Sequence, residues 1–211
     1  MISNSRGVDD DQFELDLYII RRKIEKRVLE DEHINDFYLC SFSCRSIIYK
    51  GMFLAEQLTN FYPDLLDERF ISRFAIYHQR YSTNTFPTWP LAQPFRMLAH
   101  NGEINTLRGN INWMRSHESR MESERFGEHI ENLKPVIPLG SSDSAALDAA
   151  FELLVRADRT APLVKTILIP DSWSEKKVMT KKHRDLLHYC NCVSEPWDGP
   201  AAISATDGRW V

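Results

Sequence analysis

The chain has 211 residues, 43% of them hydrophobic and 27% charged, with a formal net charge of -4. These values are ordinary for one globular domain with a sizeable core, and the lack of a Lys/Arg-rich stripe argues against a nucleic-acid partner. No apolar run approaches the roughly 18 residues that a membrane span needs, and the polar N-terminus is unlike a signal peptide. We therefore expect a cytoplasmic protein with no membrane partner, in which Cys40, Cys44, Cys190 and Cys192 are reduced thiols.

The first half of the chain is expected to contain both helices and strands. Residues 1–14 are expected to form a polar tail, and an amphipathic helix follows it, with one apolar face made by Leu17, Ile20, Ile24 and Val28. A short helix is expected to end before Pro63, because proline cannot continue a helix. Aromatic and β-branched residues indicate β structure elsewhere: a hairpin over 36–51 and strands over 73–83 and 95–100.

The second half of the chain is predicted to be mainly helical. One helix is expected to begin at Asn105 or Thr106, and another after the small polar residues around Asp143, with Leu147, Phe151 and Leu154 on one face. The apolar run 162–170 suits either a strand or a helix, and 201–211 is expected to be one arm of a hairpin that turns at Asp-Gly. Together these elements predict an α+β layered domain.

The stretch "HNGEINT" at 100–106 is the first candidate for chemistry. Asn-Gly between apolar runs is usually only a hairpin turn. Here it is surrounded by more polar residues than a turn needs, and glycine lets a backbone approach a ligand closely. The side-chain amide of Asn101 and the backbone N–H of Gly102 are the kinds of donor that stabilise an oxyanion.

Three further residues complete a possible amino-acid pocket. Arg80 has a forked donor group that suits a carboxylate, and Thr83 adds a hydroxyl donor, although an edge-strand salt bridge explains Arg80 equally well. Asp143 is expected at a helix start, where it can serve as a cap or receive a ligand ammonium group. Cys190 and Cys192 lie near two histidines but lack the paired spacing of a metal site, so no metal ligand is assigned.

Several motifs resemble the glutamine amidotransferase type-2 domain of glutamate synthase large subunits. The resemblance is carried by "HQRYSTNTFPTWPLAQPFRMLAHNGEINTLRGNINWMR" and by "RRKIEK", "IIYKGM", "GSSDSAALD" and "EPWDGPAAI", and it runs through residues 15–211. It implies the four-layer αββα sandwich of the N-terminal nucleophile hydrolases. It also implies glutamine as the substrate, with ammonia passed on to 2-oxoglutarate in a synthase half that uses FMN and an iron-sulfur cluster.

The resemblance also assigns roles to the candidate residues. It implies that Arg80 and Thr83 hold the glutamine α-carboxylate, that Asp143 binds the α-ammonium group, and that Asn101 and Gly102 form the oxyanion hole. The family uses a cysteine at the mature N-terminus as its nucleophile, and this chain begins "MISNSR". We therefore expect a fragment, incomplete at both ends of the sandwich, that is inactive alone, carries no cofactor and needs the remainder of the large subunit.

Two alternatives remain open at this point. Besides a piece of glutamate synthase, they are a piece of another class II amidotransferase and a non-enzymatic glutamine-binding module that works with a complementing chain. The length of the central motif favours glutamate synthase over the first alternative.

Overall fold

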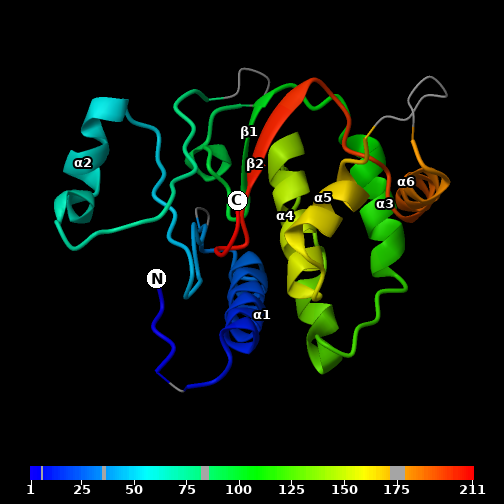
Figure 1. Ribbon diagram of the computed structural model, residues 1–211. Helices are drawn as coiled ribbons and strands as arrows, with labels where there is room; N and C mark the ends of the chain where they lie inside the picture. The colour runs from blue at the N-terminus through cyan, green and yellow to red at the C-terminus, as the bar shows by residue number, and fades with distance from the viewer. Residues whose placement is uncertain (6, 35–36, 82–85, 172–178) are drawn as a thin grey trace.

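The computed structural model describes residues 1–5, 7–34, 37–81, 86–171 and 179–211. In these ranges, helices surround one small antiparallel sheet, as expected for an α+β protein (Figure 1). The helices are α1 (Asp10–Leu29), α2 (Leu58–Phe61), α3 (Arg108–Glu118), α4 (Asp143–Arg156), α5 (Ala161–Leu168) and α6 (Lys181–Val193). The strands are β1 (Leu98–Gly102) and β2 (Ala201–Ala205), and the 3₁₀ helices are η1 (Ala55–Gln57), η2 (Pro63–Leu66), η3 (Trp89–Leu91) and η4 (Gly127–Leu133).

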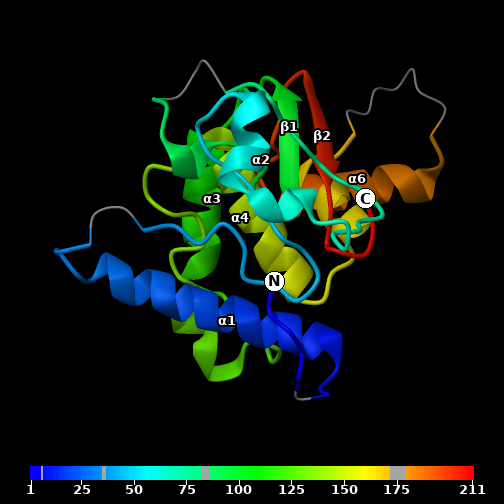
Figure 2. The same ribbon diagram turned by 90° about the vertical axis from the view of Figure 1, so that its left-hand side faces the viewer.

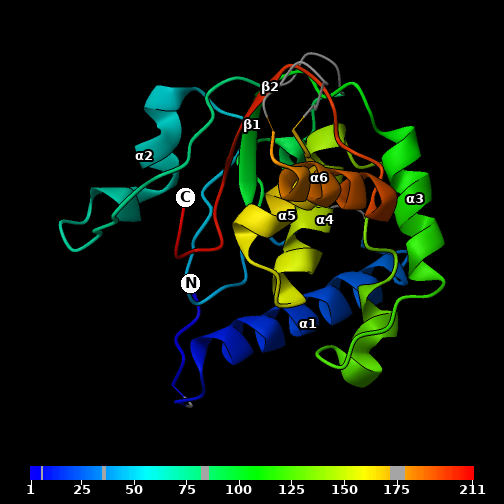
Figure 3. The same cartoon turned by 45° about the vertical axis from the view of Figure 1, so that its right-hand side comes forward.

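Helix α4 is the centre of the hydrophobic core. It packs against α1, α5 and β1, and its Leu147 and Phe151 are almost completely buried, as the helical spacing predicts. Leu154 is only partly buried at the edge of the same core. The helix begins with Ser142 as its N-cap, whose hydroxyl oxygen accepts a hydrogen bond from the Ala145 N–H. Seen from two further directions, α1 crosses below α4 while α5 and α6 cover its other side (Figures 2 and 3).

Helix α1 is present where the sequence predicts one, but it begins earlier and buries a different face. Asp9 caps it by accepting bonds from the N–H groups of residues 11 and 12. Ile20, predicted to face the core, is 45% exposed, whereas Arg21 is 2% exposed. Arg21 can be buried because it forms ion pairs with Glu25 and with Glu152 of α4. Hydrophobic periodicity alone does not anticipate a buried arginine that has two carboxylate partners.

The two strands form one antiparallel ribbon that joins distant parts of the sequence. Leu98 pairs with Ala205 and Gly102 pairs with Ala201. The strand predicted over 95–100 is therefore present, displaced toward Asn101 and Gly102. The predicted arm at the C-terminal end is present as β2, and the chain bends at Asp207–Gly208 as expected. The hairpin itself does not form, because β2 pairs with β1 and no strand follows the bend in the described residues.

Two other predicted β segments contain no strand in the ranges that the structure describes, 37–51 and 73–81. Alternation of side chains is not enough to form a strand, because each strand also needs a neighbour for its backbone N–H and C=O groups. Side chains bind the first segment instead: the Glu14 carboxylate accepts bonds from the Ser43 hydroxyl and the Cys44 N–H, and the Tyr62 hydroxyl donates to the Lys50 carbonyl. Residues 36, 82 and 83 of these predictions lie outside the described residues.

Helical predictions elsewhere are mostly confirmed, with shifted boundaries. The short helix before Pro63 is η1 followed by α2, and the apolar run at 162–170 is helix α5. Helix α3 begins at Arg108 with Leu107 in the cap position, later than predicted. The predicted cap residues are bound to 196–198 instead: the N–H of Asn105 donates to the Asp198 carbonyl at 2.7 Å, and the Thr106 hydroxyl donates to the Pro196 carbonyl and accepts from the Asp198 N–H.

Among the described residues, none of the helices combines the length and apolar character that crossing a membrane requires.

Candidate functional site

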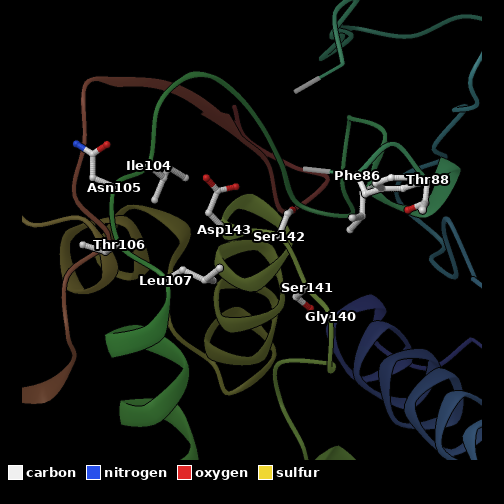
Figure 4. Close-up of a pocket in the computed structure, with 11 residues that line it drawn as sticks. Phe86, Thr88, Ile104, Asn105, Thr106, Leu107, Gly140, Ser141, Ser142 and Asp143 are labelled. Carbon is white, nitrogen blue, oxygen red and sulfur yellow. The ribbon is translucent and has the colours of Figure 1, made fainter. Parts of the chain in front are cut away.

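A cavity of about 470 Å³ lies between the N-terminus of α4 and the segment that follows β1 (Figure 4). Three stretches of chain line it: 86–91, 104–107 and 140–143. The first contains η3, the second leads from β1 into α3, and the third caps α4. The cavity is thus bounded by elements that are anchored in the core.

Asp143 places a carboxylate at the edge of this cavity. Its Oδ1 atom accepts hydrogen bonds from the N–H and the hydroxyl of Ser144, at 2.6 and 3.0 Å. Figure 4 shows the carboxylate standing at the end of α4 beside Ile104, while the side chain of Asn105 points away from it. The positive end of the α4 dipole stabilises the negative charge there. A ligand ammonium group in the cavity would meet this charge.

Asn101 and Gly102 are the last two residues of β1, immediately before the stretch 104–107 that lines the cavity. Both are exposed. Hydrogen-bonding groups of successive residues in an antiparallel strand point to alternate edges. The N–H and C=O of His100 point away from β2, because both bind the side chain of Gln93. The N–H of Gly102, two residues on, therefore points to the same outer edge.

Glycine is required at 102 by both conformation and space. Its φ of +103° is disfavoured for other residues, and a Cβ there would lie 2.3 Å from the Pro200 carbonyl oxygen. Gly199 faces the same segment, and a Cβ at that position would lie 2.1 Å from the Glu103 carbonyl oxygen. The stretches around these two glycines are thus in direct backbone contact, and the contact holds the Asn101-Gly102 end of β1 in place.

The other two predicted site residues are not joined to this cavity. Arg80 is exposed and is absent from the described residues that line it. Thr83 lies outside the described residues. The structure therefore brings Asp143 close to the segment that follows Asn101 and Gly102, and leaves the assignments of Arg80 and Thr83 as predictions.

The residues that support β1 from behind are not among those predicted from the sequence. Asp148 of α4 is 2% exposed and accepts hydrogen bonds from the backbone N–H groups of Arg96, Met97 and Leu98. Burial, together with the nearby Glu152 carboxylate, raises the pKa of Asp148 to about 6. The "SDSAALD" pattern gives a hint of this, since an aspartate in the middle of an apolar helix face needs partners.

The segment "EPWDGP" is part of the same support. Trp197 is 3% exposed, and its backbone N–H donates to the Leu168 carbonyl at 2.8 Å. The side-chain amide of Asn110, also missed, donates to the carbonyls of Glu195 and Pro196. Helix α3 is thereby tied to the stretch that contacts Gly102.

The four cysteines, all in described parts of the chain, are free thiols, and none of them lines the cavity. Burial raises the pKa of Cys40 and of Cys190. Burial and the Glu14 carboxylate raise the pKa of Cys44 to about 11. In the part of the chain that the structure describes, no group of three or more His, Cys, Asp or Glu side chains is placed to hold a metal ion.

Comparison with known proteins places this site in context. A family model described as "Glutamine amidotransferases class-II" matches residues 1–211. The chain is 68% identical over its whole length to the glutamate synthase [NADPH] large chain of Azospirillum brasilense, covering 14% of that protein. It is 48% identical over 96% of its length to the large chain from Bacillus subtilis, covering 13% of it, and 43% identical over its whole length to the ferredoxin-dependent glutamate synthase of Antithamnion sp., covering 14%.

Proposed function

The chain belongs to the class II glutamine amidotransferases, and from this premise we propose that it binds glutamine and supports release of ammonia from the glutamine side chain. The observation that carries the proposal is the position of Asp143, a carboxylate at a cavity whose wall continues directly from Asn101 and Gly102. A glutamine bound by its ammonium group at Asp143 has its side chain free to extend toward those donors.

The proposed roles follow from the charges that change during the reaction. Attack of a nucleophile on the carboxamide carbon moves an electron pair onto the carbonyl oxygen. The Asn101 side-chain amide and the Gly102 N–H donate to that oxygen and stabilise its charge. The C–N bond then breaks, ammonia leaves, and water releases glutamate from the acyl intermediate. Arg80 and Thr83 are proposed to bind the α-carboxylate of the substrate.

We place the nucleophile outside the four cysteines described above. None of them lines the cavity, and burial disfavours the thiolate form of Cys40, Cys44 and Cys190. The resemblance to the family assigns this role to a cysteine at the mature N-terminus, which supplies its own α-amino group as base.

We further propose that the chain works within a longer glutamate synthase polypeptide in the cytoplasm. It spans about 14% of the length of the relatives that it matches. In that polypeptide, further strands would complete the four-layer αββα sandwich around the β1–β2 ribbon, and a synthase part would use the ammonia to convert 2-oxoglutarate to glutamate. The FMN and iron-sulfur cluster of such an enzyme are proposed to lie in that other part.

The experiment is a glutaminase assay on the full-length polypeptide with Asp143→Asn. Loss of the charge that binds the ammonium group should raise the KM for glutamine about tenfold or more, with a smaller effect on kcat. Asp185→Asn, on the exposed side of α6, is the matched control and should leave both constants unchanged. Absence of ammonia release by the unmodified polypeptide would contradict the proposed activity and favour a non-enzymatic glutamine-binding module.

A further inference from the structure

The outer edge of β1, the edge that faces away from β2, is hydrogen-bonded along most of its length by groups outside the sheet, chiefly the side chains of Asp148 and Gln93. At Leu98, the N–H donates to Asp148 at 3.1 Å and the carbonyl accepts from the Phe95 N–H at 2.8 Å. At His100, the N–H donates to Oε1 of Gln93 at 2.6 Å and the carbonyl accepts from Nε2 of Gln93 at 2.9 Å. Gly102 is the next residue whose N–H points to this edge.

The Gln93 carboxamide has the same donor and acceptor as a peptide group. It therefore binds one residue of β1 as a neighbouring strand would, satisfying both backbone groups of His100. A real strand would continue along the edge and bind the next residue as well. A side chain ends after one residue, so it supports His100 and leaves the N–H of Gly102 available to a ligand.

Gln93 is itself firmly placed. It lies between two buried residues, Ala92 and Phe95, which are 5% and 3% exposed, and it follows η3, whose Leu91 lines the cavity. Its Nε2 atom also lies 3.4 Å from Nδ1 of His100, so the side chain contacts both the backbone and the ring of that residue. His100 is 6% exposed, which keeps water away from these hydrogen bonds.

We propose that Gln93 is a positioning residue for glutamine hydrolysis, fixing the His100 peptide group so that the Asn101 side chain and the Gly102 N–H converge on one carbonyl oxygen. This inference rests on the proposed function. Gln93 does not touch the substrate in this account. It acts through the two donors that follow His100.

The test uses the full-length polypeptide with Gln93→Met, which keeps the length of the side chain but removes its donor and acceptor. Because small misplacements of catalytic donors are costly, kcat for ammonia release should fall by about 10- to 100-fold while KM for glutamine changes little. Gln12→Met, in the first turn of α1, removes one side-chain hydrogen bond far from the site and is the matched control. It should leave kcat unchanged.

A double-mutant cycle distinguishes positioning from a general structural role. Asn101→Ala removes one of the two donors through which Gln93 acts. Gln93→Met should therefore lower kcat by a clearly smaller factor when Asn101→Ala is already present than when Asn101 is intact. Equal losses of kcat with and without Asn101→Ala would overturn the proposal, as would a loss confined to KM.

A second variant covers the case in which Gln93→Met does not fold. Gln93→Glu retains the acceptor for the His100 N–H and removes the donor to its carbonyl, so it should lose kcat to a smaller extent and show the same non-additivity. Nuclear magnetic resonance of the Asn101 side-chain amide gives a readout that needs no catalysis. If the unmodified polypeptide releases no ammonia, the proposed activity is wrong. If the Asn101 side-chain amide is as well ordered in Gln93→Met as in the unmodified polypeptide, the proposed positioning role is wrong, whatever the activity.

Discussion

A single residue, Asn101, carries the clearest expectation about catalysis. An oxyanion donor acts on the transition state more than on the bound substrate. Asn101→Ala should therefore cost about 3 kcal/mol of transition-state stabilisation, seen as a fall in kcat of about 10²-fold, with little change in KM. Asn60→Ala, on the exposed side of α2, is the control and should have no effect. The constants come from steady-state ammonia release, and a change confined to KM would reassign Asn101 to substrate binding.

The cysteines give a second expectation at the residue scale. Replacing Cys40, Cys44, Cys190 and Cys192 with alanine should leave the turnover of the full-length polypeptide within about twofold of the unmodified enzyme. The reason is that none of these thiols lines the cavity and that burial disfavours the reactive thiolate in most of them. Each cysteine is changed singly as well, so that an effect of lost packing at the fully buried Cys190 is separated from an effect on chemistry.

Asp148 should titrate within the physiological range. Its pKa in the folded protein is about 6, above the usual 3.8, because burial and Glu152 disfavour the charged form. A raised carboxyl pKa contributes stability that is complete below about pH 4 and is lost as the pH rises through 6. Removing this carboxylate in Asp148→Asn abolishes that loss. The unfolding free energy of Asp148→Asn relative to the unmodified protein should rise by up to about 3 kcal/mol between pH 4 and pH 8.

The measurement is denaturant unfolding of both full-length proteins across this range of pH, together with the carboxyl carbon resonance of Asp148. The other carboxylates are the same in both proteins, so their titration cancels in the comparison. A midpoint below pH 4.5 for the Asp148 resonance would contradict this prediction. It would show that the three backbone N–H donors lower the pKa of Asp148 by more than burial raises it.

At the scale of elements, the N-terminus of α4 links stability to the site. The Ser142 hydroxyl accepts from the Ala145 N–H at 3.2 Å. Ser142→Ala should destabilise the first turn by about 1 kcal/mol, which corresponds to roughly fivefold faster hydrogen exchange at Ala145. Ser142→Asp retains an acceptor and should preserve the protection. Unchanged exchange in Ser142→Ala would mean that packing of α4 alone holds this turn and Asp143.

Helices of this protein could be predicted from sequence better than its strands. The period of Leu147 and Phe151 and the small polar residues before them are local signals, and α4 begins within a few residues of its predicted start. Strands depend on partners elsewhere in the chain. The alternation of Phe74 and Ile76 resembles that of a strand, yet no strand forms in the described part of that segment, whereas β1 finds its partner in residues 201–205.

The sequence indicates which residues are candidates for the site, but it predicts only part of how they are arranged. Asp143 at a helix start follows from local sequence, and Asn101-Gly102 follows from motif resemblance. Gln93 and Asp148, which support the site, bind backbone N–H and C=O groups. Every residue type has these groups, so the sequence does not show which of them will be bound. These contacts depend on the folded backbone. Asp148 and Met97 are 51 residues apart, and the Gln93 side chain reaches His100 only because the chain between them turns back.

At the scale of the whole molecule, the aromatic arm, defined here as residues 46–77, gathers several exposed apolar side chains. It contains contacts among Tyr49, Phe53 and Tyr62, but Phe61, Ile71 and Tyr77 are 63%, 88% and 83% exposed. Figure 1 shows α2 on this arm, away from the other helices. An exposed apolar surface of this kind favours association, since each such side chain gains roughly 1.5–3 kcal/mol when it is fully buried.

We therefore expect the 211 residues expressed alone to associate or to be poorly soluble. Expression within the full-length polypeptide should restore solubility, by adding strands to the ribbon and covering the arm. Size-exclusion chromatography with light scattering measures both results. A monomer with a sharp cooperative melt would show instead that the ribbon and helices are sufficient for a stable fold.

The close approach of Gly102 to Pro200, and of Gly199 to Glu103, limits which substitutions the two motifs can accept. A methyl group at either position would collide with a carbonyl oxygen of the opposite stretch, at 2.3 Å from residue 200 or 2.1 Å from residue 103. Because both obstacles are backbone atoms, no side-chain substitution can make room for the methyl group. Either glycine can therefore change only if the backbone of the opposite stretch moves. We expect a substitution at one of them to disturb both "HNGEIN" and "EPWDGP", and not only the motif that carries it.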